Sequence, residues 1–314
     1  MSTEKPPIQL VTTAHPAVTP PATQPPKTYT KQQLAVIDFR HKMEVYATES
    51  IPKLLGEYNI DPSQRTETHT FIQSAINFVK SDPKLIDAFI VNPASMFASI
   101  LVGAEMGLKP SKETGEFFLI PRNIKQPDGS YKLTVCPQIG YKGLVAILLR
   151  SGDVVKLTAE VVYEEEFFKV SYGSDPRIEH EPNFDAQRTA DKIKYAYATA
   201  TLKNGEKQFD VVTRAQIEAV RDMSPTENAL YFSDGKGANR WMEKKTALVQ
   251  LSKMLPKDYY SKKGIGIDGM VDGGGTLTLN DRNEIVLIEN SPAAKIRKPS
   301  SRFRNIYDTL DGTK

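Results

Sequence analysis

The sequence predicts an α+β fold, since the spacing of its apolar residues changes along the chain from helical to strand periodicity and back. Helical segments come first, a strand hairpin and another helix follow, and a meander of strands then leads into further helices. Proline gathers near the start of the 314-residue chain and glycine near its end. We therefore expect a folded core with a flexible segment on each side.

Composition sets the limits of this core. Residues 1–30 hold seven prolines among threonine, alanine and glutamine, too little apolar surface to fold. After Tyr260 the run KKGIGIDGMVDGGG is rich in glycine. We expect a disordered arm over 1–30, a folded domain over 31–262 that suffices for folding and binding, and a flexible tail over 263–314 with one short strand, Glu284 to Glu289.

Amphipathic spacing predicts the helices that open the folded part. The first covers Gln32 to Leu55, with apolar residues at Leu34, Ile37, Val45 and Ala47. The second covers Glu67 to Lys80, with Phe71, Ala75, Phe78 and Val79 on one face. A third begins after Asn92 as its cap, has Pro93 in its first turn and stops at Gly107.

Strand periodicity follows at Phe117 to Arg122 and Tyr131 to Gln138, which we expect to pair as a hairpin. Gly140 to Arg150 returns to helical spacing, with Gly152 as its stop. Further strands are expected at VVKLTAEVVY, EEFFKVSY, YAYATATL and KQFDVV, the last two joined by a Lys203-Asn204-Gly205 turn.

Two helices close the predicted core. Thr213 is expected to cap a helix that runs through Arg221, and a last helix covers Asn239 to Leu255 and ends at Pro256.

Bulk properties narrow the function classes. A formal charge of +3 is too small to prove a polyanionic partner, so the distribution of charge matters more than its sum. The single cysteine, Cys136, excludes an intrachain disulfide and indicates a reducing compartment. The start of the chain does not have the pattern of a signal peptide, and the longest apolar run, Leu144 to Leu149, cannot span a bilayer. A cytoplasmic protein is expected.

Several short segments between residues 90 and 257 form a recognisable series. They are Met106-Gly107-Leu108-Lys109-Pro110, FFLIPR, Gly140-Tyr141-Lys142-Gly143-Leu144, Arg150-Ser151-Gly152, VVYEEEFF, His180-Glu181-Pro182, YAYATATLKNG, VVTRAQIEAVR, Lys244-Lys245-Thr246-Ala247 and Leu255-Pro256. Each segment alone is unspecific, but their order and spacing are hard to obtain by chance. Together they resemble the RecT family of phage-encoded single-strand annealing proteins.

This resemblance implies a protein that binds single-stranded DNA and anneals it to a complementary strand without ATP, in phage or prophage homologous recombination and DNA repair. It also implies assembly into rings or filaments, a phage 5′–3′ exonuclease as partner, and a β-β-β-α core to which the meander and flanking helices are added. A host single-strand-binding protein is a further candidate partner. No cofactor is expected, although Mg²⁺ could modulate DNA binding.

Phosphate contacts require cationic side chains, and bases require flat ones. On the Gly140 helix, Lys142 and Arg150 lie within about 80° of each other, so they are candidates for neighbouring phosphates. On the last helix, Lys244 and Lys245 fall on or beside the apolar stripe formed by Trp241, Leu248, Leu251 and Leu255. These lysines either extend to solvent along their stems or border a groove for a polyanion.

Other candidates are less distinctive. Lys109, Arg122, Arg214 and Arg221 are DNA-binding candidates for which ordinary solvated surface charge is an equal alternative. Among aromatic residues, Tyr141 is the best candidate to stack on a base, while Tyr197 and Phe118 fit a core role better. The acidic run Glu164-Glu165-Glu166 is either a solvated edge or a surface that faces a basic patch on the next subunit.

Enzyme classes find little support. The sequence has no GxxxxGK[ST] phosphate loop, its four histidines have no metal-ligand spacing, and no nucleophile elbow occurs. The sharpest alternative is a metal-dependent nuclease that uses Asp234, Glu243 and Lys245. A scaffold that binds protein through the proline-rich arm is a second alternative. The sequence therefore predicts a DNA-annealing protein without a catalytic site.

Overall fold

The computed structural model describes residues 29–57, 59–126, 129–223, 232, 239–257, 259–272 and 274–288. Within these ranges helices and antiparallel strands alternate broadly as expected, so the α+β class is confirmed. The proline-rich arm over 1–28, Asp234 and the end of the expected tail lie outside the described residues.

The amino-terminal helices are α1 (Lys31–Thr48), α2 (Ser50–Leu54), α3 (Thr66–Lys80), α4 (Pro83–Val91) and α5 (Pro93–Glu105). The helix expected over Gln32 to Leu55 is broken at Glu49, whose φ of −130° leaves the helical region. A single 3₁₀ turn, Pro62–Gln64, precedes α3. The α3 and α5 predictions are confirmed, and α4 is an addition that the sequence reasoning missed.

The core face of α1 was predicted wrongly. Its buried residues are Ala35, Phe39 and Met43, and Phe39 packs edge-on against Phe89 of α4 at 5.3 Å between ring centroids. The predicted core residues Leu34, Ile37 and Val45 are 53%, 50% and 64% exposed. Apolar residues occupy two opposite faces of this helix, so periodicity alone could not choose between them.

The middle of the chain follows the prediction. Strands β1 (Phe117–Lys125) and β2 (Tyr131–Ile139) pair antiparallel, with Phe117 opposite Ile139. They lead into α6 (Tyr141–Arg150), whose buried side includes Leu144 and Leu148. The β1–β2 hairpin packs against α4 and α5.

A three-stranded antiparallel sheet in the order β3 (Val154–Tyr163), β6 (Ile193–Leu202), β7 (Lys207–Thr213) forms the second half of the fold. The hairpin of β4 (Phe167–Ser171) and β5 (Arg177–Glu181) is inserted between β3 and β6. Helix α7 (Arg214–Met223) follows β7, and the Thr213 hydroxyl accepts a hydrogen bond from the Gln216 amide at 3.3 Å, which confirms the predicted cap.

The carboxy-terminal part corrects the expected flexible tail. Helix α8 (Trp241–Ser252) is followed by α9 (Tyr259–Asp272) and by the pair β8 (Thr276–Leu279) and β9 (Ile285–Ile288). Lys263 of α9 forms an ion pair with Glu105 of α5 at 2.6 Å between Nζ and Oε1. The expected domain boundary at residue 262 therefore falls inside a helix that is part of the fold.

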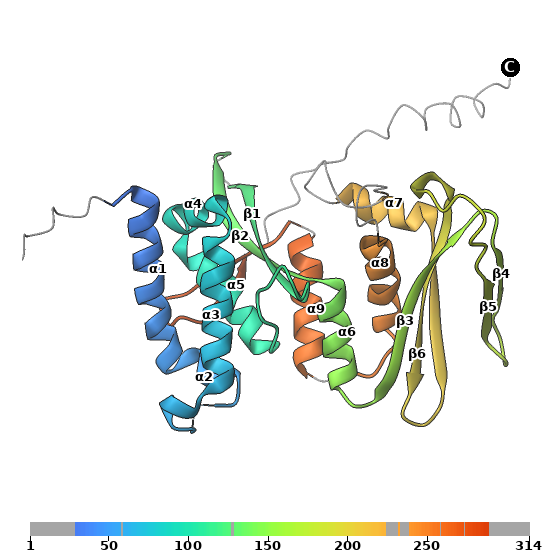
Figure 1. Ribbon diagram of the computed structural model, residues 1–314, viewed down its shortest axis with the longest axis horizontal. Coiled ribbons are helices and arrows are strands. Elements are labelled where there is room, and N and C mark those ends of the chain that lie inside the picture. The colour runs from blue at the N-terminus through green and yellow to red at the C-terminus, as the bar shows by residue number, and fades with distance from the viewer. Residues whose placement is uncertain are drawn as a thin grey trace, which may run out of the picture.

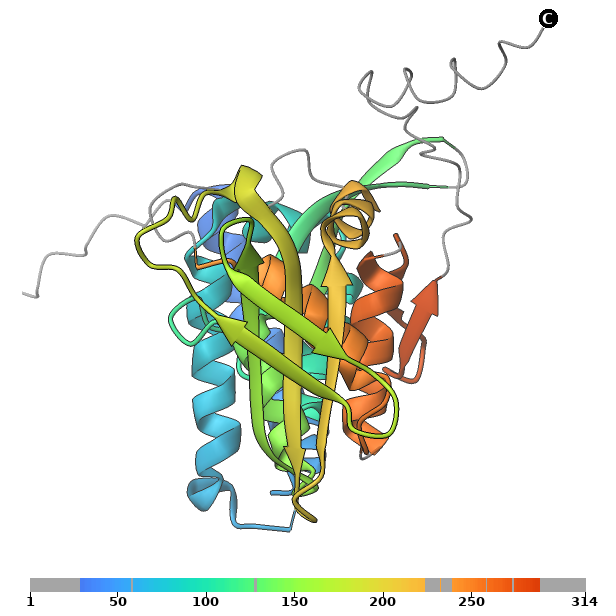
Figure 2. The same cartoon turned by 90° about the vertical axis from the view of Figure 1, so that its right-hand side faces the viewer.

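Figure 1 shows how these parts are arranged: the α1–α5 bundle lies at one end, the β3–β6–β7 sheet at the other, and α6 and α9 between them. Helix α8 packs on one face of the sheet, where Ala196, Ala198 and Ala200 of β6 are buried. Figure 2 shows the β4–β5 hairpin lying across the opposite face. There Phe168 stacks on Tyr195 and Tyr197, each at 5.5 Å between ring centroids.

Among the described helices, none alone is long and apolar enough to cross a membrane; α4 and α5 meet those criteria only as a pair, which bends by 116°.

Candidate nucleic-acid interface

The first turn of α6 is held against the loop before β1 by two glycines. The Gly140 amide donates to the Glu116 carbonyl at 2.8 Å. A Cβ atom on Gly140 would lie 2.1 Å from the Gly115 carbonyl oxygen, and one on Gly143 would lie 2.1 Å from that of Glu116. The Gly-Tyr-Lys-Gly motif thus brings two backbone segments together and fixes the positions of Tyr141 and Lys142.

Replacing Gly143 by alanine is expected to force these backbones apart and to lower the free energy of unfolding by about 1–3 kcal/mol, as for other overpacked sites. Chemical denaturation measures this loss. Gly152→Ala is not a suitable control because its φ is +76°. Gly266→Ala, within α9, places a Cβ with nothing within 4 Å and should leave stability unchanged or raise it by up to about 1 kcal/mol, because alanine is the better helix former. Equal stability of the Gly143 and Gly266 variants would contradict the close approach.

Tyr141 and Trp241 are the first residues of α6 and α8, and their rings touch. The centroids lie 4.8 Å apart at an angle of 44°, and Trp241 remains 41% exposed. Burial, and then the nearby Glu160 carboxylate, raise the pKa of Tyr141, so its hydroxyl keeps its proton at neutral pH. Two aromatic surfaces therefore meet in a place that solvent can reach.

Positive charge surrounds this aromatic pair. Lys142 is exposed and forms no ion pair with the described residues. Lys244 lies 5.9 Å from the centre of the Trp241 ring, and its ammonium is 2.9 Å from Glu160. Neither α6 nor α8 has a side-chain cap at its amino terminus. The buried Glu243 carboxylate lies in the first turn of α8 and offsets the partial positive charge there, so the uncompensated helix end is that of α6. We call Tyr141, Lys142, Trp241 and Lys244 the α6–α8 junction.

The other lysine of the last predicted helix has a structural role. Lys245 is buried, and its Nζ lies 2.8 Å from Oδ2 of Asp268 on α9. The other carboxylate oxygen of Asp268 accepts the Ile139 amide at 2.7 Å. This pair ties α8 and α9 to the end of β2, so the Lys245 ammonium is engaged inside the protein rather than exposed to a phosphate.

Arg150 and Lys109 are placed near the end of α5. Arg150 donates to the carbonyl of Met106 at 2.6 Å and reaches that of Gly107 at 3.5 Å, where it satisfies the end of that helix. Lys109 forms an ion pair with Glu67 at 2.8 Å. Lys142 and Arg150 are eight residues apart, about 12 Å along α6, so they lie at opposite ends of the helix rather than side by side.

The remaining arginine candidates have structural contacts. Arg214 donates to the carbonyls of Ala190, Asp191 and Ile193 at 2.9–3.1 Å. Its guanidinium and that of Arg221 lie 4.7 and 5.5 Å from the ring of Phe232. Arg221 also pairs with Asp222, and Arg122 approaches the Val271 carbonyl at 3.4 Å. Of the residues predicted to contact DNA, the structure brings Tyr141 and Lys244 together at the Trp241 ring. Lys142 follows Tyr141 in the chain and is exposed.

The aromatic residues expected to be core are confirmed as packed. Phe118 meets Phe78 edge-on at 6.4 Å, and Tyr197 stacks under the β4–β5 hairpin.

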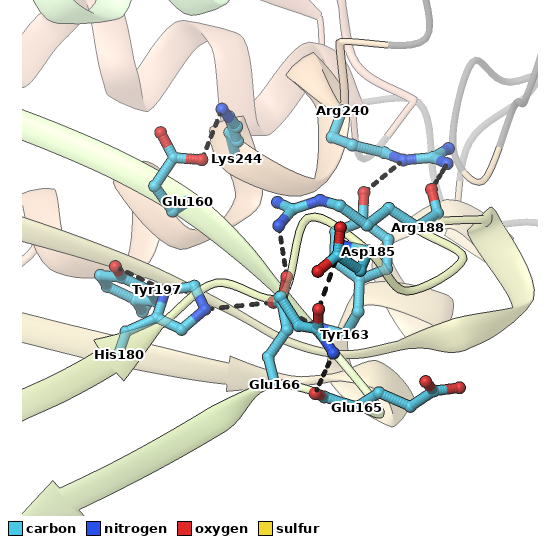
Figure 3. A network of polar contacts seen from close by, with 11 residues as sticks. Glu160, Tyr163, Glu165, Glu166, His180, Asp185, Arg188, Tyr197, Arg240 and Lys244 are labelled. Atoms are coloured by element: carbon cyan, nitrogen blue, oxygen red, sulfur yellow. Dashed lines mark hydrogen bonds and ion pairs between the residues drawn. The ribbon is translucent and has the colours of Figure 1, made fainter.

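The sequence reasoning missed a buried network of polar side chains beneath the β4–β5 hairpin, drawn in Figure 3. The Glu166 side chain is 0% exposed and accepts from His180 Nε2 at 3.1 Å, from Arg188 and from the Tyr163 amide.

The side chains of this network join the β4–β5 hairpin to the β3–β6–β7 sheet. His180 Nδ1 lies 3.1 Å from the Tyr197 hydroxyl, whose pKa is raised by burial and then by Glu160 and Glu166. Arg240, the residue before α8, donates to the Tyr163 hydroxyl at 3.1 Å. Glu166 is thus not part of a solvated edge. Glu164 pairs with Lys192 at 3.1 Å, and Glu165 remains exposed.

The nuclease alternative gains no support from the described residues. No group of three or more histidine, cysteine, aspartate or glutamate side chains in them is arranged to hold a metal ion. Glu243 is buried and accepts the Phe232 amide at 2.6 Å, while Lys245 pairs with Asp268. Glu243 and Lys245 therefore serve separate internal contacts.

Trp241 is the site residue that the sequence reasoning misread. It was counted in the apolar stripe of its helix, whereas it is the first residue of α8 and half-exposed beside Tyr141. The sequence did contain a signal. Trp241 comes just before the helical repeat becomes regular, and a lysine follows three residues later.

Comparison with known proteins places the chain in a family. A profile of the RecT family matches residues 69–266, more than half of the chain and all four residues of the α6–α8 junction. Protein RecT of Escherichia coli (strain K12) is 35% identical over 178 residues, which cover 55% of this chain and 62% of the E. coli protein. The chain spans less than two thirds of that relative. On the extent of the profile match, this chain belongs to the RecT family.

Proposed function

We propose that this protein binds single-stranded DNA at the α6–α8 junction and anneals it to a complementary strand, without ATP and as an oligomer, in homologous recombination. The observation that carries this proposal is the half-exposed pair of Tyr141 and Trp241 at the start of two helices, with Lys244 beside the Trp241 ring and the exposed Lys142 next to Tyr141 in the chain. Family membership supports the same reading.

The chemistry of the junction suits a single strand. An exposed aromatic ring stacks on any base, because every base has a π face, and it leaves the pairing edges free for the complement. Lysines and helix amino termini bind phosphate oxygens without reading sequence. A surface of this kind holds a strand in a form that can pair, which is what annealing requires.

Among the residues predicted to contact phosphate, we favour those whose charge is not engaged inside the protein. Lys142 is the strongest, since it is exposed and forms no ion pair in the described part of the chain. Lys244 contributes only by exchanging Glu160 for a phosphate. We assign Lys245, Arg150 and Arg214 to the fold instead, because each is engaged by internal acceptors.

Annealing of two complementary oligonucleotides, one carrying a fluorophore and the other a quencher, tests the function. We expect the purified protein to accelerate quenching with no ATP present and with EDTA added. A requirement for ATP, or cleavage of either strand after Mg²⁺ is added, would contradict the proposal. The same assay with and without Mg²⁺ shows whether that ion modulates binding.

Replacing Lys142 by alanine is expected to flatten the plot of log affinity against log salt by about 0.7, the contribution of one phosphate contact on a single strand. The loss should be similar for all sequences. Lys84→Ala removes an equally exposed lysine from α4 and should leave the slope unchanged. An unaltered slope for the Lys142 variant, with assembly intact, would remove Lys142 from the site.

Partners follow from the same proposal. An annealing protein needs a source of single strands, so we propose a 5′–3′ exonuclease of a phage or prophage as its partner, and a host single-strand-binding protein as a second one. Co-purification of the full chain with each candidate tests these two partners. Cytoplasmic location is part of this proposal.

A further inference from the structure

Helix α1 carries a second apolar stripe that nothing in the described residues covers. Leu34, Ile37 and Val45 are its apolar residues, and the polar His41, which lies 3.6 Å from the Glu44 carboxylate, falls on the same face between Ile37 and Val45. The core stripe of Ala35, Phe39 and Met43 lies on the other side. A surface helix normally turns polar residues to water, so an exposed apolar stripe marks a contact with another molecule. We call these four residues the α1 stripe.

A groove of about 770 Å³ runs beside this stripe, between α1 and α3. Its charged lining is Arg40 and Arg65 against the single carboxylate of Glu44, which lies 3.6 Å from His41. Arg65 is buried and donates to the carbonyls of Ile60 and Thr48, so Arg40 is the cation that a partner can reach. Arg40 is exposed and forms no ion pair with the described residues. The groove therefore suits a partner that brings acidic side chains next to apolar ones.

Such a surface exists at the other end of the same molecule. Where β4 begins and β5 ends, Glu165, Phe167, Glu181, Phe184 and Asp185 are all exposed; Phe167 is 52% exposed and Phe184 81%. The three carboxylates of this set form no ion pair within the described ranges. Residues 164–192 contain eight acidic and four basic residues in a chain whose net charge is +3. We call the five exposed residues the acidic corner.

We propose that the α1 stripe of one copy packs against the acidic corner of the next copy. Figure 1 places α1 and the β4–β5 hairpin at opposite ends of the long axis, so both surfaces of one molecule can be occupied at once. The apolar residues would cover one another, and the basic groove would face the three carboxylates. A contact between two different surfaces is heterologous and propagates into a ring or a filament.

This inference rests on the proposed function, which includes assembly, and it names the surfaces that assemble. The alternative occupant of the α1 stripe is a second α1 stripe related by a two-fold axis, which would give dimers only. The two arrangements predict different assembly states for a mixture in which one chain carries a mutated α1 stripe and the other a mutated acidic corner.

The experiment uses full-length chains in sedimentation velocity, with and without a single-stranded oligonucleotide. The stripe variant is Leu34→Asp with Ile37→Asp, and the corner variant is Phe167→Ser with Phe184→Ser. All four side chains are at least half exposed, so each variant should fold, and thermal unfolding checks this. Met254→Asp, at a residue that is 57% exposed, is the matched control and should assemble as the unmodified protein does.

Each variant alone is expected to sediment as a monomer of 35.0 kDa. An equimolar mixture is expected to form a species of twice that mass and nothing larger, since only one complementary pair of surfaces remains. Arg40→Glu should weaken assembly, and adding Glu181→Arg to the same chain should restore it. Assembly of the stripe variant alone, a mixture that stays monomeric, or loss of assembly in the control would overturn the proposal.

The result is separable from the proposed function. Both variants keep the α6–α8 junction, so each should still bind a short oligonucleotide with the salt slope of the unmodified chain. If the unmodified protein assembled by these surfaces but failed to anneal, the function would be wrong and the interface right. If the unmodified protein annealed strands and both variants still assembled, the function would be right and the interface wrong.

Discussion

Replacing Asp268 by alanine is expected to lower the free energy of unfolding by about 3–5 kcal/mol, the usual cost of removing one partner of a buried ion pair. The Lys245 ammonium would lose its buried carboxylate, and the Ile139 amide would lose its acceptor. Chemical denaturation of the full chain measures the loss. A large part of the total stability of a domain would disappear with this one side chain.

The same experiment decides what Lys245 does. Lys245→Ala should also be strongly destabilised, while Lys142→Ala, at an exposed position, should unfold as the unmodified protein does. If Lys245 bound a phosphate instead, Lys245→Ala would flatten the plot of log affinity against log salt and leave the free energy of unfolding unchanged. If Lys245→Ala proved stable and lost one phosphate contact, the structural role would be wrong.

Removing both charges while keeping the hydrogen bond separates charge from packing. In the double variant Lys245→Met with Asp268→Asn, the amide oxygen still accepts from Ile139 and no charge is left unpaired. Most of the stability lost in Asp268→Ala should return, because a buried ion pair is often no better than a neutral pair of similar volume.

Lys245 also illustrates what the sequence could and could not predict. Its place on the apolar stripe of the last predicted helix was correct. The two roles considered for it, extension to solvent or the border of a polyanion groove, did not include its buried ion pair with Asp268. Its partner, Asp268, lies in the run that was predicted to be a flexible tail, because glycine was taken as a sign of mobility. Gly264 instead permits close packing: a Cβ there would lie 2.2 Å from Met106 Sδ.

Helix α1 shows a second limit of periodicity. Two apolar faces satisfy the helical repeat equally, and the choice between them is made by α4 and α5, whose Phe89 and Phe97 meet Phe39. Local sequence does not contain that information. The hairpin turns, α6 and most strands were predictable because each has one apolar face and a clear stop signal, whereas the short strands β5 and β8 were missed.

For the candidate site, the Gly-Tyr-Lys-Gly motif predicted Tyr141 and Lys142, which the structure places in the first turn of α6. The junction became visible only when the fold placed the start of α8 beside that of α6, a hundred residues away. Basic residues are hard to assign from sequence, because an arginine that donates to helix carbonyls, as Arg150 does, has the same local sequence pattern as one that binds phosphate.

Replacing Trp241 by alanine is expected to weaken single-strand binding by roughly 5- to 150-fold, since base stacking on one aromatic side chain contributes about 1–3 kcal/mol. Trp241→Phe should retain most of the affinity, because a flat ring remains. The direct measurement is fluorescence: this is the only tryptophan in the chain, so a stacked base should quench the emission of the unmodified protein.

The salt dependence distinguishes stacking from charge. Trp241→Ala removes no charge, so its plot of log affinity against log salt should run parallel to that of the unmodified protein and lie below it. Lys142→Ala should instead flatten the plot. Tyr141→Ala should follow the tryptophan variant, because the two rings form one surface. If emission did not change at saturating oligonucleotide, and Trp241→Ala bound as tightly as the unmodified chain, the strand would have to bind elsewhere, and the α6–α8 junction would be only a contact between two helix ends.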